Sequence, residues 1–282
     1  MRNCAICLLA MMLLLQACVP LDEMISSPMK KHVAMSRISI MKQLEQSEQE
    51  QGQIRLLVLG DSVALGKGST QNGRGYAWYV SKFLERQHLD VQYINRAVSG
   101  QTSADLLHRL RVEEKLQHEV AQADLILVTI GGNDLLQTLL KEKNPWKLVK
   151  RFPAIQTRYR ENMHQILQLL HARNRHAVVM LTSLYNPVDA ASPFHNKADW
   201  LIRRWNHGLE EVVSPFDQTI VVNLEAFLPS SQLADQIHPN DQGYRWIGAK
   251  CVQALKTNTI PSSTVQPVVH RRQRSVIDLL MF

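Results

Sequence analysis

Residues 55–70 read RLLVLGDSVALGKGST, a mostly apolar run that stops at a glycine followed by an aspartate and a serine. A short apolar run that ends at a glycine is typical of a strand buried on both faces that leads into a tight turn. Two kinds of loop take this form. One binds a phosphate through its backbone amides, and the other presents a serine nucleophile. The rest of the sequence decides between them.

Apolar runs of this kind recur along the chain and alternate with amphipathic stretches. The runs that predict strands are 54–59, 91–95, 124–130, 177–182 and 219–223. The stretches that predict helices are 76–87, 104–110, 158–171, 198–213 and 242–255. Regular β-α alternation favours a parallel sheet covered by helices on both faces. The sequence therefore predicts an α/β fold, a single three-layer domain over residues 53–256.

Polar and glycine residues follow several of the predicted strands. They are Gly60-Asp61-Ser62, Gly100, Gly131-Gly132-Asn133-Asp134 and, just past the fifth strand, Asp235-Gln236-Ile237-His238-Pro239. The carboxyl ends of parallel strands meet at one edge of the sheet, and ligands of such proteins bind there. We therefore expect these four groups to converge on one site.

The phosphate interpretation fails on spacing. A phosphate-binding loop has the form GxxxxGK followed by serine or threonine, which binds magnesium. Here five residues separate Gly60 from Gly66, and Lys67 is followed by Gly68. Both the spacing and the hydroxyl are wrong, so the sequence favours the serine nucleophile.

A serine hydroxyl attacks a carbonyl only when a base removes its proton, and imidazole oriented by a carboxylate does this well. Asp235 and His238 are close enough in sequence for one turn to direct both side chains to the same place. The developing oxyanion needs hydrogen-bond donors. The candidates are the backbone amides of Ser62 and Gly100 and the side-chain amide of Asn133. These residue types predict acyl transfer from an ester.

These blocks resemble, in order and over about 180 residues, those of the SGNH or GDSL hydrolases. The resemblance implies a flavodoxin-like α/β/α sandwich and a serine esterase or lipase activity without metal or organic cofactor. It also implies a catalytic triad of Ser62, Asp235 and His238, and an oxyanion hole formed by Ser62, Gly100 and Asn133. Val63 stands where the family name has leucine, a conservative apolar exchange.

The N-terminus has the form of a secretory signal, because Arg2 precedes an apolar stretch at 6–15 that is too short to span a membrane. The sequence Leu15-Gln16-Ala17-Cys18 resembles the lipobox of bacterial lipoproteins. It predicts a signal peptide over 1–17 and acylation of Cys18; a plain cleaved signal is the alternative. We then expect an extracytoplasmic protein that is anchored to a bacterial membrane through Cys18 and a flexible tether over 18–52.

The remaining composition agrees with that location. Once the other three cysteines are removed or acylated, Cys251 stands alone, which predicts a buried thiol and no intramolecular disulfide. Residues 257–282 read as a disordered tail with a basic cluster and an apolar end. The net charge of +7 suits an anionic surface such as a membrane. The basic residues are too scattered to suggest nucleic acid.

The sequence says least about the substrate. Residues 139–153 combine aromatic and basic side chains and form a candidate cap over the acyl site. A fatty-acyl or phospholipid-type ester at the membrane is the preferred interpretation. Two alternatives remain open: removal of O-acetyl groups from cell-envelope carbohydrate, and a surface lipoprotein that binds its ligand without turning it over. Asp61 and Asp134 are expected to shape loops, and His195 to be a solvated residue at the rim.

Overall fold

The chain is described by a computed structural model over residues 36–71, 73–142, 145–224 and 228–262. The predicted signal peptide, Cys18 and most of the predicted tail lie outside these residues. Among the helices that are described, none combines the length and apolar character needed to cross a bilayer.

Five parallel strands form the central sheet, in the order β3-β2-β4-β5-β6. They are β2 (Ile54–Gly60), β3 (Val91–Asn95), β4 (Leu125–Thr129), β5 (Val178–Thr182) and β6 (Thr219–Val222). All five correspond to predicted strands, and the predicted α/β class is confirmed. Within this sheet, β2 comes first along the chain. The next strand, β3, lies on one side of β2, and the following strand, β4, lies on the other. The carboxyl ends of β2 and β4 thus flank the switch point, where such sheets bind ligands.

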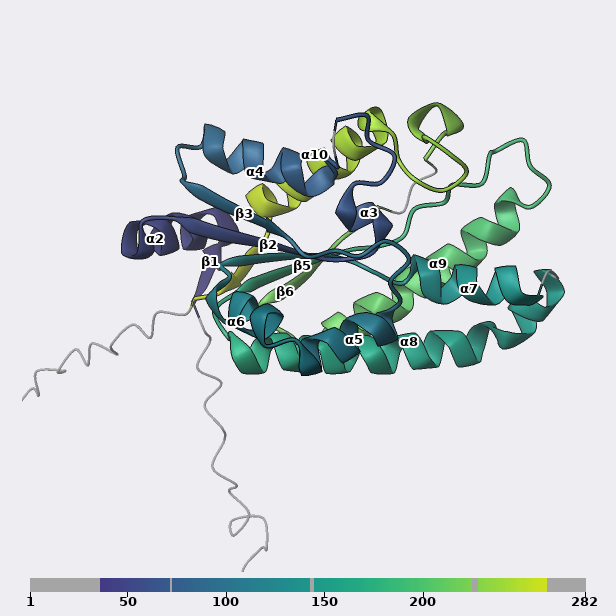
Figure 1. Ribbon diagram of the computed structural model, residues 1–282, viewed down its shortest axis with the longest axis horizontal. Coiled ribbons are helices and arrows are strands. Elements are labelled where there is room, and N and C mark those ends of the chain that lie inside the picture. The colour runs from purple at the N-terminus through teal and green to yellow at the C-terminus, as the bar shows by residue number, and fades with distance from the viewer. Residues whose placement is uncertain (1–35, 72, 143–144, 225–227, 263–282) are drawn as a thin grey trace, which may run out of the picture. The chain divides into compact units, whose positions relative to one another are not determined.

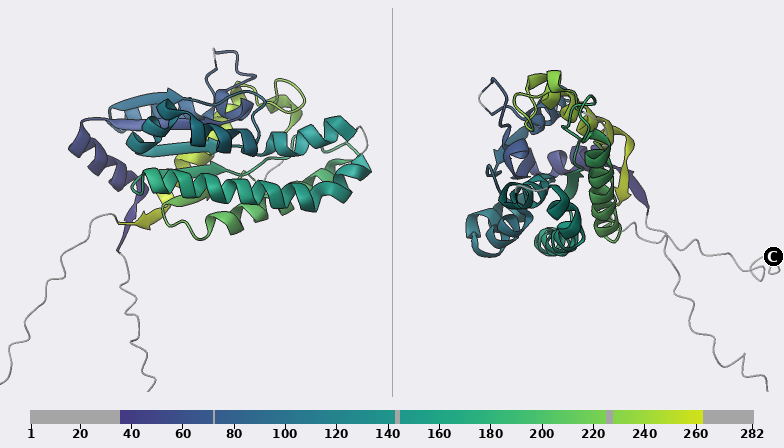
Figure 2. Two further views of the ribbon diagram at one scale, coloured as in Figure 1. Left: turned by 60° about the horizontal axis from the view of Figure 1, so that its bottom comes forward. Right: turned by 90° about the vertical axis from the view of Figure 1, so that its right-hand side faces the viewer.

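Helices cover both faces of this sheet (Figure 1). One face carries α2 (Ile40–Gln51), α4 (Tyr76–Arg86) and α10 (Asp241–Thr257). The other face carries α5 (Ser103–Val112), α6 (Glu114–Gln122), α8 (Pro145–Arg173) and α9 (His195–Val213). Two short helical elements are α3 (Ser62–Leu65) and the 3-10 turn Ser230–Gln232, and α7 (Gly132–Glu142) packs on α8. Figure 2 shows the same layers from two further directions.

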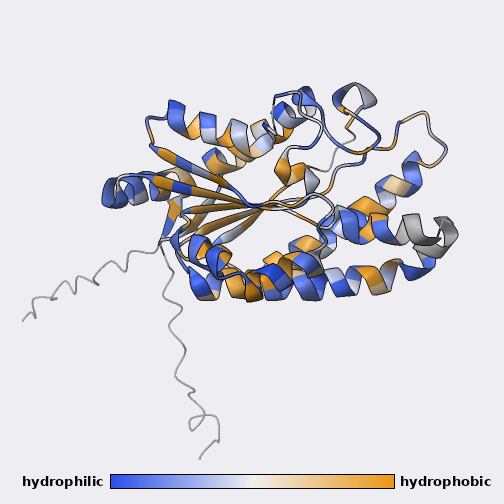
Figure 3. Ribbon diagram, viewed as in Figure 1, coloured by the Kyte–Doolittle hydropathy of each residue, from blue (hydrophilic) through white to orange (hydrophobic). Residues whose placement is uncertain are grey.

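The strands are apolar on both faces, which is why their side chains divide between two cores. In β2, Leu56 and Val58 belong to the core under α4 and α10, whereas Leu57 and Leu59 belong to the core under α5 and α8. Figure 3 shows the central strands mainly in the hydrophobic colour and the outer helices striped. Cys251 is fully buried in the first core, and its thiol is free, as predicted.

Several helices differ from the prediction. Helices α6 and α7 were not predicted, and α8 begins at Pro145 rather than at residue 158. Pro153 lies inside α8. The candidate cap at 139–153 therefore comprises the end of α7 and the first turns of α8, with residues 143–144 outside the described part.

The folded unit also extends beyond the predicted limits of 53–256. Strand β1 (Arg37–Ser39) pairs antiparallel with β7 (Thr259–Pro261), and α2 begins directly after β1. Ile40 and Leu44 of α2 are fully buried in the first core. The predicted tether and tail are thus wrong over residues 36–52 and 257–262. The reason is that α2 is polar apart from a few side chains, so its pattern alone does not indicate a core contact.

Replacing Leu44 with alanine tests this extension. Leu44→Ala removes a fully buried side chain and should lower the free energy of unfolding by about 2–5 kcal/mol. Val112→Ala, at a side chain that is 56% exposed, serves as the control and should change it by less than about 0.5 kcal/mol. Urea denaturation measures both. Equal, small effects would mean that α2 lies outside the folded unit.

Candidate active site

Ser62 is placed by the turn that ends β2. Gly60 has φ +127°, and a Cβ atom there would lie 1.9 Å from the carbonyl oxygen of Thr129 in β4. Because a side chain cannot fit, glycine is required for this close approach of the two strands. Asp61 then caps α3, with its Oδ1 accepting a hydrogen bond from the backbone N–H of Val63 at 2.9 Å. Ser62 is the first residue of α3 and is buried.

His238 reaches Ser62 from the other end of the chain. Its Nε2 lies 3.0 Å from Ser62 Oγ, although 176 positions separate the two residues. Its Nδ1 lies 2.6 Å from Asp235 Oδ2. The structure thus brings together the three predicted triad residues in the order hydroxyl, imidazole, carboxylate. This arrangement can move a proton from the hydroxyl to the ring while the carboxylate holds the ring's orientation.

Asp235 sits in a tight bend that suits a carboxylate. Its Oδ1 accepts from the backbone N–H groups of Ile237 at 2.9 Å and His238 at 2.8 Å. Partial burial opposes the ionised form, but these two bonds and the His238 ring together outweigh it and lower the pKa of Asp235 to about 2. The carboxylate is therefore ionised at any pH at which the imidazole acts as a base.

Not all of the three predicted oxyanion donors line the cavity. Asn133, in the first turn of α7, lines the cavity beside Ser62. Its Nδ2 donates to the carbonyl of Gln101 at 2.9 Å, which orients the amide. Gly100 is exposed at φ +83° in the loop just before Gln101 and is not among the described residues that line the cavity. The structure therefore joins Ser62 and Asn133 at one cavity, and Gly100 does not contribute to the described lining.

Asp61 and Asp134, which were expected to shape loops, differ in exposure: Asp61 is buried beside Ser62, and Asp134 is half-buried in the first turn of α7. Burial raises the pKa of Asp61 to about 7, despite its backbone hydrogen bonds. Asp134 accepts hydrogen bonds from Ser103 N at 3.0 Å and Ser103 Oγ at 2.5 Å, which join α7 to α5. Burial raises the pKa of Asp134 as well, against these bonds.

A cavity of about 220 Å³ opens beside Ser62 and His238. Its walls come from α7, from the loop after β5 and from the first turns of α9, and most of its lining side chains are apolar. The apolar members are Val63, Leu135, Leu136, Leu184, Pro187, Val188, Ala198, Leu201, Ile202, Leu224 and Ile237. A mostly apolar cavity with a few polar groups is typical of a small-molecule site.

The loop after β5 is fixed by residues that the sequence did not single out. Asn206 of α9 accepts from Leu184 N at 2.9 Å and donates to Leu184 O at 2.8 Å. Tyr185 Oη donates to Ile237 O at 2.5 Å. His195, expected to be solvated, is half-buried, and its Nδ1 lies 2.7 Å from Val188 O. These contacts form only when the fold brings the partners together, and no local sequence motif predicts them.

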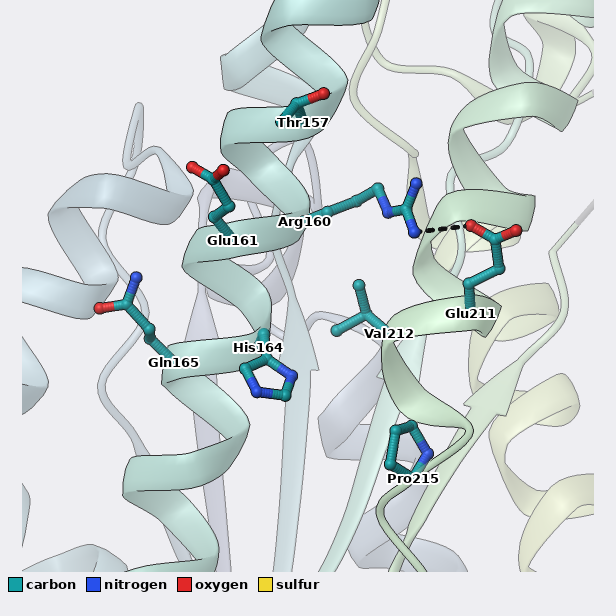
Figure 4. Close-up of a pocket in the computed structure, with 8 residues that line it drawn as sticks. All are labelled: Thr157, Arg160, Glu161, His164, Gln165, Glu211, Val212 and Pro215. Carbon is teal, nitrogen blue, oxygen red and sulfur yellow. Dashed lines mark ion pairs between the residues drawn. The ribbon is translucent and has the colours of Figure 1, made fainter.

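A second cavity, a groove of about 440 Å³, lies between α8 and α9 (Figure 4). It is lined by Thr157, Arg160, Glu161, His164, Gln165, Glu211, Val212 and Pro215. The Arg160–Glu211 ion pair, 2.8 Å long, crosses it between two half-exposed side chains. Among the described residues, the two cavities have no lining residue in common, and Ser62 and His238 line the first.

Comparison with known proteins agrees with this geometry. The model of the GDSL-like lipase/acylhydrolase family matches residues 58–246, a range that contains Ser62, Asn133, Asp235 and His238.

Three relatives are similar over most of their length. YpmR of Bacillus subtilis is 27% identical over 260 residues, which cover 89% of this chain and 95% of YpmR. The spore germination lipase LipC of Bacillus licheniformis is 28% identical over 205 residues, 70% of this chain and 94% of LipC. The crystal structure of the lipase Lip_vut3 from a goat rumen metagenome superposes with a TM-score of 0.60 at 25% identity, covering 71% of this chain and 97% of Lip_vut3.

The buried carboxyl of Asp61 predicts a pH-dependent stability. Between its ordinary pKa of 3.8 and about 7, the unfolded chain releases the proton that the folded chain retains. The free energy of unfolding therefore falls as the pH rises through this window, by roughly 4 kcal/mol from this group. Asp61→Asn keeps an oxygen for Val63 N and removes the titration. Relative to wild type, the variant should gain stability between pH 4 and pH 8, as measured by urea denaturation.

Asp217→Asn, at an exposed carboxylate in the loop before β6, is the control. Because no buried carboxyl is removed, this variant should not show the gain in stability with rising pH. The absence of that gain in Asp61→Asn as well would show that burial does not raise the pKa of Asp61 in the folded protein.

Proposed function

Because the chain belongs to the GDSL-like lipase/acylhydrolase family and is a carboxylic ester hydrolase, we propose that it hydrolyses fatty-acyl or phospholipid-type esters through an acyl-enzyme on Ser62. The observation that carries this proposal is the 3.0 Å contact between Ser62 Oγ and His238 Nε2 at an apolar cavity. Asp235, 2.6 Å from the far side of the imidazole, completes the proposed triad.

In the proposed reaction, Ser62 Oγ attacks the ester carbonyl carbon while its proton passes to His238 Nε2. The carbonyl oxygen takes the negative charge and is stabilised by the amide of Ser62 and the side chain of Asn133, with Gly100 as a third donor if its loop closes on the substrate. His238 then gives the proton to the leaving alcohol. A water molecule attacks the acyl-enzyme with His238 again as the base, which releases the carboxylic acid and restores Ser62.

The cavity supports a chain longer than acetyl. Its volume of about 220 Å³ far exceeds the space of one methyl group, and leucine is its most frequent lining residue. An acetyl ester would leave most of this apolar surface unused. Each methylene that enters it contributes about 0.8 kcal/mol. The apolar lining therefore favours the fatty-acyl substrate over O-acetyl groups on carbohydrate.

The proposed location rests on the N-terminal sequence. Acylation of Cys18 would hold the enzyme at the outer side of a bacterial membrane, where lipid esters are concentrated. The net charge of +7 supports contact with an anionic lipid surface. Lipidation and extracytoplasmic location are thus part of the proposal.

Substitution of the two proposed catalytic side chains tests the mechanism. A fluorophosphonate probe should label the full-length protein, and Ser62→Ala and His238→Ala should each abolish labelling. Both variants should lose ester hydrolysis by roughly 10⁴-fold or more, as in other enzymes of this chemistry. The measurements are gel fluorescence and p-nitrophenyl ester hydrolysis.

Matched controls are available on α9 and directly after it. Ser214→Ala and His207→Ala change exposed side chains and should leave labelling and hydrolysis unchanged. Hydrolysis that survives Ser62→Ala would place the nucleophile elsewhere.

The acyl cavity predicts a dependence on chain length. From acetyl to hexanoyl esters, kcat/KM should rise by about fourfold for each methylene that enters the cavity. Ala198→Phe adds a ring to the cavity wall and should shift the preference towards short esters. Asn196→Phe adds the same bulk at an exposed position of α9 and should not. A strict preference of the wild type for acetyl esters would instead support the carbohydrate alternative.

A further inference from the structure

The hydrogen bonds around His238 include one that the proposed triad does not use. The phenol of Tyr185, in the loop after β5, donates to the carbonyl oxygen of Ile237 at 2.5 Å. That carbonyl belongs to the peptide group between Ile237 and His238. The N–H of the same peptide group donates to Asp235 Oδ1 at 2.8 Å. One peptide plane therefore lies between the phenol and the carboxylate and is held from both sides.

The bend that carries His238 needs such an external contact. Residues 234–238 have no regular secondary structure, and the bend is closed on itself by Ala234 N donating to His238 O at 2.8 Å. In the described part of the chain, two hydrogen bonds join residues 235–238 to other segments. One is the contact of His238 with Ser62, and the other comes from Tyr185. The first is broken and re-formed during the proposed reaction, so the second is the permanent one.

Tyr185 is itself well fixed. Its neighbour Leu184 is bonded through both backbone groups to Asn206 of α9, at 2.9 and 2.8 Å. One residue before Leu184, Ser183 Oγ accepts from Leu224 N at 2.7 Å, which joins the loop to the segment just after β6. Burial raises the pKa of the Tyr185 phenol well above its ordinary range. The hydroxyl therefore keeps its proton and remains a donor at every pH at which the enzyme could work.

We propose that Tyr185 is a positioning residue for the acid–base pair: its phenol holds the Ile237–His238 peptide plane and so keeps the imidazole within reach of the serine. This rests on the proposed function of Ser62 and His238. Tyr185 acts from the loop after β5, an element that carries none of the proposed triad residues. Displacement of a catalytic group by about 1 Å can lower the rate by 10²-fold, so one such bond matters.

Tyr185 also lines the acyl cavity, and the test must separate the two roles. Tyr185→Phe retains the ring, and hence the wall, and removes the hydroxyl. If the hydroxyl positions His238, kcat should fall about 10- to 100-fold with KM within about twofold of wild type. The loss should be the same for an acetyl and a hexanoyl ester, because proton transfer is common to both. The rate of labelling by a small fluorophosphonate should fall in parallel.

Tyr244→Phe is the matched control. Its phenol donates to the carbonyl of Lys67 at 2.6 Å, a bond of the same type that does not involve residues 235–238. It should leave kcat within about twofold of wild type. Thermal unfolding of both variants shows whether each is folded at the assay temperature, and the assays are run below the lower transition.

Three results would overturn the proposal: an unchanged kcat for Tyr185→Phe, a loss confined to KM of the longer ester, or an equal loss for Tyr244→Phe. Ser62→Ala, assayed alongside, separates this failure from that of the proposed function. An inactive Ser62→Ala with a fully active Tyr185→Phe contradicts the positioning role alone.

Discussion

The site depends on the close approach of β2 and β4 where the two strands end. Asp61 N donates to Thr129 O at 3.0 Å, and this contact lies next to Gly60, whose position admits no side chain. Strand β2 stays paired with β4 up to its last residue, Gly60. The chain therefore turns immediately after the strand, at the edge of the sheet. The turn exposes the first residue of α3 to the cavity while its backbone stays tied to the sheet. Ser62 is thus placed by strand pairing rather than by the flexibility of a loop.

The segment that carries His238 is held at this edge because the start of α10, which follows it, contacts the segment after α3. Asp241, at the start of α10, accepts from Ser69 Oγ at 2.7 Å and Thr70 N at 3.1 Å. These contacts join the start of α10 to the residues that follow α3, so the segment that carries His238 and the turn that carries Ser62 are fixed relative to each other. This explains how two residues 176 positions apart keep a 3.0 Å contact.

The sequence predicted what local pattern encodes. Buried strands are apolar throughout, so all five strands of the sheet and the residues at their ends were identifiable. The pattern fails where a segment gains its stability from a few tertiary contacts. Helix α2 is polar apart from a few side chains such as Ile40 and Leu44, which are buried. Strands β1 and β7 pair although they are far apart in the sequence. The roles of Asn206 and Tyr185 were equally invisible, because each bonds to backbone atoms that only the fold brings near.

The carboxyl groups around Ser62 differ in pKa according to their surroundings. Asp235 lies beyond the imidazole, where positive charge would develop, and its hydrogen bonds lower its pKa to about 2. Asp61 lines the same cavity as Ser62, and Asp134 interacts electrostatically with Asp61. Burial raises the pKa of both, that of Asp61 to about 7. An ionised carboxylate there would oppose the forming negative charge. Environments that push carboxyl pKa values apart in this way are characteristic of sites that separate acid and base roles. Burial of the aspartate that precedes the serine therefore shapes the turn and also limits negative charge where the reaction would create it.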